Sequence, residues 1–175
     1  KVNLLLNILG RRTDGFHELE TVMHPVRLHD VLTFERTGAE VVLTCSEPGL
    51  PTDAHNLVHR AASAFLQAAK IRDGVKIHLE KKIPLAAGLG GGSGNAATTL
   101  LGLNELFGGP LAAEPLHELA AALGSDVPFF LQPPLALCTG RGEVVQPLRG
   151  AIRRHLVVMW PGFGVSTAAV YRSGM

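Results

Sequence analysis

The spacing of hydrophobic positions divides the middle of the chain into two clear elements. From Asn56 to Lys70 apolar residues recur every three to four positions, which predicts an amphipathic helix. From Val75 to Glu80 the period changes to two, which predicts a strand with one apolar and one polar face. A helix followed by a strand, each with its own hydrophobic period, indicates a domain that contains both kinds of structure.

The remaining elements are predicted from shorter patterns and from turn residues. Thr37-Gly38 suggests that two strand-like segments form a hairpin, and Ser166 can cap a last helix. Strands clustered between helices favour an α+β domain over a doubly wound sheet. The predicted strands cover residues 2–9, 18–28, 30–36, 40–45, 135–139, 144–147 and 156–159, and the predicted helices cover 95–106, 114–123 and 166–171.

Composition narrows the class of protein. The 175 residues include 46% hydrophobic and 18% charged residues, which is typical of one globular domain. A net charge of +1 provides no general attraction for nucleic acid or anionic membranes. No apolar run approaches the ~20 residues of a membrane span, and no signal peptide is recognisable. Cys45 and Cys138 lie far apart, so we expect free thiols and a cytoplasmic protein.

The candidate chemistry lies in a glycine-rich segment between a predicted strand and a predicted helix. Glycines let a backbone wrap closely around a ligand, and a helix N-terminus attracts anions, so the segment predicts a phosphate site. It consists of Pro84, Leu85, Ala86, Ala87, Gly88, Leu89, Gly90, Gly91, Gly92, Ser93 and Gly94, followed by Asn95-Ala96-Ala97.

Known phosphate and nucleophile motifs fit this segment poorly. It contains no lysine, which excludes a Walker A loop. The dinucleotide pattern is met by residues 92–97, but it does not follow a strand directly and lacks an acidic residue at the end of a second strand. The nucleophile-elbow pattern fails because Asn95 stands where glycine is required. A nicotinamide-binding oxidoreductase is therefore a weak alternative.

Three separated segments resemble the GHMP kinase superfamily, and within it the 4-diphosphocytidyl-2-C-methyl-D-erythritol kinases. They are Lys1-Val2-Asn3-Leu4 with Arg12-Thr13-Asp14-Gly15-Phe16-His17-Glu18-Leu19, the glycine segment, and Gly124-Ser125-Asp126-Val127-Pro128. The resemblance implies an ATP-dependent small-molecule kinase of the non-mevalonate isoprenoid pathway, with a fold similar to a ribosomal-protein domain. It also implies that residues 1–159 form the N-terminal catalytic domain and that 160–175 lead to a C-terminal α+β domain. Because both ends look cut, we expect a fragment that lacks this second domain.

The resemblance also implies roles for individual residues. Asp126 would be the general base and Lys1 its supporting cation. Residues 84–94 would bind ATP together with Asn56 and Lys81, while Asn3, Phe16, His17 and Tyr171 would bind the substrate. The family has serine where Gly94 stands, so we expect no side-chain metal ligand there and a Mg²⁺ held mainly by ATP oxygens and water. His55 and His59, spaced four apart, are better explained as a helix surface than as a metal pair.

Two further classes stay open at this point. Another GHMP kinase, for homoserine or a sugar, shares the ATP loop, but the Arg12–His17 segment argues against it. An RNA-binding domain shares the fold, but the chain lacks a basic, aromatic-rich stripe. We therefore expect a small-molecule substrate, no nucleic acid or membrane partner, and a monomer or weak homodimer.

Overall fold

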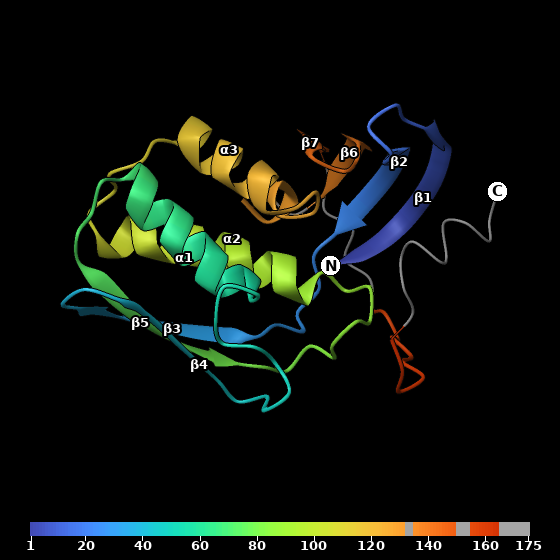
Figure 1. Ribbon diagram of the computed structural model, residues 1–175. Coiled ribbons are helices and arrows are strands. Elements are labelled where there is room, and N and C mark those ends of the chain that lie inside the picture. Colours follow the sequence, from blue (N-terminus) through green and yellow to red (C-terminus); the bar gives the residue numbers. More distant parts are fainter. Residues whose placement is uncertain (132–134, 150–154, 165–175) are drawn as a thin grey trace.

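The computed structural model describes residues 1–131, 135–149 and 155–164, and it contains two sheets and three α-helices (Figure 1). One sheet has the strand order β1-β2-β6-β7 and the other β3-β5-β4. The strands are β1 (Val2–Arg11), β2 (His17–His24), β3 (Val31–Thr37), β4 (Val41–Cys45), β5 (Gly74–Glu80), β6 (Ala136–Gly140) and β7 (Val144–Pro147). The helices are α1 (Leu57–Ala68), α2 (Gly91–Leu106), α3 (Ala113–Leu123) and the 3₁₀ helix η1 (Pro128–Leu131).

The main core lies between the three-stranded sheet and α1 and α2, which cover one of its faces (Figure 1). The apolar stripe of α1 buries Phe65, and the apolar face of β5 buries Ile77. Helix α2 adds Leu100 and Leu103, both fully buried. Helix α3 packs against the same cluster. The helical and strand periodicities of the sequence are thereby confirmed as core-facing surfaces.

The predicted hairpin between β3 and β4 is wrong. Both strands exist, but β5 lies between them, antiparallel to β3 and parallel to β4. Parallel strands need a long crossover, and α1 supplies it between β4 and β5. The 38–40 connection instead crosses the end of β5, where Val75 N donates to Glu40 O at 3.0 Å. A Cβ on Gly74 would lie 2.3 Å from the Glu40 backbone, which explains the glycine.

Two further predictions differ from the structure: the start of one helix and the existence of one strand. Helix α2 begins at Gly91 rather than Asn95, so the last glycines of the glycine-rich segment form its first turn. Residues 156–159 form no strand, because they pair with no strand in the described part of the chain and their side chains face solvent (Val157 is 92% exposed). The predicted helix over 166–171 lies outside the described residues.

The second sheet brings the motif residues at the N-terminal end of the chain close to the start of α2. Strand β2 pairs with β1 on one side and with β6 on the other, so the β6–β7 turn lies beside the β1–β2 hairpin. Cys138 on β6 is buried and Cys45 is partly buried; both are free thiols, as expected. Among the described helices, none combines the length and apolarity that crossing a membrane requires.

Candidate active site

A partly buried ion pair joins the two residues expected to perform the chemistry. Lys1, immediately before β1, places its Nζ 3.3 Å from Oδ2 of Asp126, which lies in the turn between α3 and η1. The Lys1 side chain is 7% exposed and that of Asp126 is 32% exposed. The cation is therefore held inside the protein, while the carboxylate remains open to a ligand.

Three further contacts fix the position of Lys1. Its Nζ donates to Asn3 Oδ1 at 2.7 Å and to Gly88 O at 3.2 Å, and its backbone N donates to Leu89 O at 2.8 Å. Asn3 in turn donates to the buried Thr21 Oγ1 at 2.7 Å. The expected proximity of Lys1 and Asn3 is confirmed, and the pair links β1 to the glycine loop (residues 84–90).

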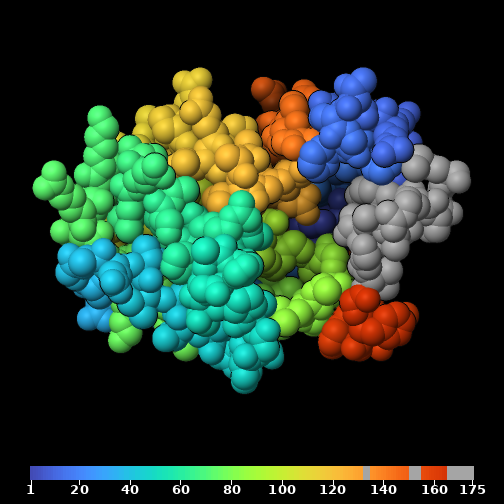
Figure 2. All heavy atoms as spheres, viewed as in Figure 1, coloured from blue at the N-terminus to red at the C-terminus, as the bar shows by residue number. Residues whose placement is uncertain are grey.

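The glycine loop leads into the N-terminus of α2 (Figure 1). Gly90 has a φ of 71° and no side chain caps the helix. The first N–H groups of an α-helix lack partners within the helix, so an anion can accept them. A Cβ on Gly90 would lie 3.1 Å from both Lys1 Cε and Phe130 Cζ, so glycine also permits this close packing. In Figure 2 the dark-blue N-terminal residues lie at the base of a hollow between the start of α2 and the β1–β2 hairpin.

The first turn of α2 offers little to bind a metal ion. Gly94 faces the Phe130 ring, with 3.3 Å between a Cβ placed there and Phe130 Cε1, and Ser93 is partly buried. Within the described ranges no group of three or more His, Cys, Asp or Glu residues gathers as a metal site. A Mg²⁺ ion carried by nucleotide phosphates would need few protein ligands here, because Mg²⁺ commonly keeps several waters.

The tip of the β1–β2 hairpin lies next to the β6–β7 turn. Phe16 is 50% exposed at this tip, and the Arg141 guanidinium lies 4.7 Å from its ring centroid. The neighbouring Gly142 lies beside the catalytic candidate, since a Cβ there would be 3.6 Å from Asp126 Oδ1. His17 begins β2 and is partly buried. The β6–β7 turn therefore lies beside both Phe16, which is expected to stack on the base, and Asp126.

Two residues expected at the nucleotide already have structural contacts. Asn56 caps α1, because its Oδ1 accepts from Val58 N at 2.9 Å and its Nδ2 donates to Pro51 O at 2.7 Å. Lys81 forms an ion pair with Asp30, whose side chain is fully buried. Their contact with ATP stays a prediction, and Tyr171 lies outside the described residues. Asp30 was missed because it stands in no recognisable motif.

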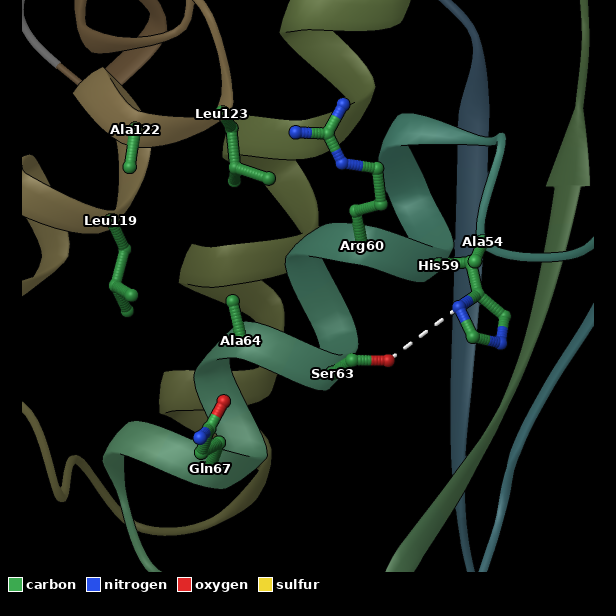
Figure 3. A pocket seen from close by; sticks show the side chains of 9 residues that line it. All are labelled: Ala54, His59, Arg60, Ser63, Ala64, Gln67, Leu119, Ala122 and Leu123. Atoms are coloured by element: carbon green, nitrogen blue, oxygen red, sulfur yellow. Dashed lines mark hydrogen bonds between the residues drawn. The ribbon is translucent and has the colours of Figure 1, made fainter.

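His55, His59 and the groove between α1 and α3 lie away from this site. His55 precedes α1 instead of lying on it and contacts Asp53 at 2.9 Å, while His59 Nδ1 lies 3.5 Å from Ser63 Oγ. A groove of about 360 Å³ includes His59, Arg60 and Leu123 in its lining (Figure 3). Its lining does not include any residue of the glycine loop.

The chain is similar in sequence and fold to known kinases. Residues 56–132 match the family described as GHMP kinases N terminal domain. The chain is 47% identical over 174 residues to a 4-diphosphocytidyl-2-C-methyl-D-erythritol kinase of Pelotomaculum thermopropionicum, covering 99% of the chain and 61% of that protein. It is 43% identical over 172 residues to the enzyme of the same name from Protochlamydia amoebophila, covering 98% and 59%. A crystal structure of 4-(cytidine 5'-diphospho)-2C-methyl-D-erythritol kinase superposes with a TM-score of 0.79 at 43% identity, covering 98% of this chain and 60% of that one.

Residues 56–132 are therefore similar to the GHMP kinase N-terminal domain, and the chain shares the mixed α+β fold of the solved kinase. Within that class, its relatives are the 4-diphosphocytidyl-2-C-methyl-D-erythritol kinases, as the motifs predicted. The chain spans about 60% of the length of these relatives.

Proposed function

We propose that the protein containing this chain transfers the γ-phosphoryl group of ATP to the 2-hydroxyl of 4-diphosphocytidyl-2-C-methyl-D-erythritol. The observation that carries the proposal is the Lys1–Asp126 ion pair beside the glycine loop. A carboxylate there can accept the proton of an attacking hydroxyl, and the ammonium can stabilise the negative charge that develops. The names of the relatives support this substrate.

Residues 84–94 would hold the triphosphate through backbone N–H groups, with Ser93 adding a hydroxyl. Mg²⁺ would bind the ATP oxygens and water and neutralise part of the phosphate charge. Phe16, with Tyr171, would stack on the cytosine, and His17 would hydrogen-bond to it. Asn3 would contact the acceptor end of the substrate, while Asn56 and Lys81 would lie near the adenine. The protein would act in the cytoplasm as a monomer or weak homodimer.

The test is phosphorylation by the full-length protein with Mg-ATP. 4-diphosphocytidyl-2-C-methyl-D-erythritol and homoserine are supplied in parallel, and ³¹P NMR identifies any new phosphate monoester. We expect a product from the cytidyl substrate only. Phosphorylation of homoserine alone would overturn the assignment and indicate a different GHMP kinase.

A second arm tests the base. Asp126→Asn retains the shape of the side chain but cannot accept the proton, so we expect kcat to fall at least about 100-fold. ATP binding, measured by calorimetry, should stay within about twofold, because the loop is unchanged. Wild-type turnover by the folded variant would remove Asp126 from the mechanism.

A further inference from the structure

One buried carboxylate outside the predicted motifs collects four donors. Asp30 immediately precedes β3, and its side chain has no exposed surface. Its Oδ1 accepts from the backbone N of Lys82 at 2.6 Å and of Ile83 at 2.8 Å. Its Oδ2 accepts from Asn95 Nδ2 at 2.9 Å and from Lys81 Nζ.

These donors come from both sides of the glycine-rich segment. Lys82 and Ile83 directly precede Pro84, where the segment begins, and Asn95 directly follows Gly94, where it ends. Asn95 is 6% exposed and lies within α2. A single side chain therefore joins the two ends of residues 84–94, which removes conformational freedom that an untied loop would retain.

The charges of this cluster are balanced. Burial raises the pKa of Asp30, but the hydrogen bonds from Ile83, Lys81, Lys82 and Asn95 outweigh it and leave the pKa below its usual value. The carboxylate is thus ionised, and it neutralises Lys81, whose Nζ would lie 3.3 Å from a Cβ on Gly91. A buried ion pair of this kind is costly to break, since either partner alone would be an unpaired charge.

We propose that Asp30 is a positioning residue for the glycine-rich segment, holding residues 82–83 and Asn95 together so that residues 84–94 keep the shape that binds ATP. The inference rests on the proposed function only in taking ATP as the ligand. A loop that is held in its binding shape binds more tightly, because less ordering remains to be done when the ligand arrives.

The test compares Asp30→Asn and Asn95→Ala in the full-length protein. Asp30→Asn removes the charge and at least one acceptor, whereas Asn95→Ala removes one of the four hydrogen bonds and leaves the ion pair intact. We expect the Kd for ATP to rise about tenfold in the first variant and about threefold in the second. The KM for the alcohol substrate should stay within about twofold, because its site does not include this cluster.

Asn104→Ala is the matched control. Asn104 ties the other end of α2 to Leu111 through two hydrogen bonds of 3.0 Å. This variant should lose stability while its Kd for ATP and its KM for the alcohol stay at wild-type values. An equal rise in the Kd for ATP would show a general effect of destabilisation and overturn the positioning role.

Hydrogen exchange supplies a readout that needs no ligand. In Asp30→Asn and Asn95→Ala, peptides covering residues 82–95 should exchange faster than in wild type, while α1 keeps its protection. Unchanged exchange and an unchanged Kd for ATP in a folded variant would refute the proposal. If Asp30→Asn does not fold, the exchange and the Kd for ATP of Asn95→Ala alone decide whether the proposal holds. Failure of the proposed function shows separately, as wild-type protein that does not turn over the cytidyl substrate.

Discussion

Replacing Lys1 by methionine tests the ion pair at the centre of the site. Methionine keeps the unbranched stem, so packing against Gly90 is preserved, while the ammonium and its contacts with Asp126, Asn3 and Gly88 are lost. Unit charges 3.3 Å apart attract by about 1 kcal/mol in water and by about 5 kcal/mol at an effective dielectric constant of about 20. Because Asp126 is 32% exposed, the lower half of this range applies.

The loss should appear in the rate more than in stability. Interactions that strengthen in the transition state lower the barrier, and in the proposed mechanism negative charge would develop beside Lys1 as phosphate is transferred. Removing one such group typically costs about 100-fold in kcat, or about 2.7 kcal/mol. We expect the free energy of unfolding to fall by about 1–2 kcal/mol, since Asn3 Oδ1 and Gly88 O lose a donor.

The assay is initial-rate kinetics on the full-length protein, with ATP affinity from calorimetry and folding from circular dichroism. Lys76→Met, the same substitution on the exposed face of β5, is the control and should keep wild-type rates. A folded Lys1→Met protein with kcat within threefold of wild type would refute the reasoning. So would an equal loss in Lys76→Met.

Three further predictions concern stability. Asn56→Ala removes the cap bond to Val58 N and should lower the free energy of unfolding by about 1 kcal/mol in urea titrations; an unchanged value would contradict the cap. Gly102→Ala places a Cβ 2.6 Å from the Phe34 ring, so we expect a loss of about 1–2 kcal/mol despite better helix propensity, and a gain in stability would show that the ring moves freely. Burial and then the charge of Asp126 raise the pKa of Cys138 to about 11, so the folded state binds the proton more tightly than an unfolded thiol of ordinary pKa 9.0. Stability should therefore fall as the pH rises from 9 to 11, with a smaller fall in Cys138→Ala, and parallel curves for the two proteins would contradict this assignment.

Local patterns predicted a helix or strand correctly where the residues of that element alone decide which of its faces is buried. The apolar stripe around Phe65 and the alternation around Ile77 predicted α1 and β5, because a helix or strand must bury its apolar face. The pairing of β3 and β4 was mispredicted because the Thr37-Gly38 turn signal is local, whereas strand order depends on where α1 returns the chain. Residues 156–159 were mispredicted because an apolar run becomes a strand only beside a partner.

The sequence by itself determined the chemical character of this protein: glycines that permit close backbone approach, a helix start that favours anions, and the motifs around Phe16 and Asp126 that indicated a GHMP kinase. The resemblance predicted that Lys1 supports Asp126, and the tertiary structure supplied the contact between them; only the tertiary structure revealed that Asp30 ties both ends of the glycine-rich segment. The reason is physical. The residue types of a segment determine its backbone freedom locally. The partner of a buried charge depends instead on the packing of strands and helices that are far apart in the sequence.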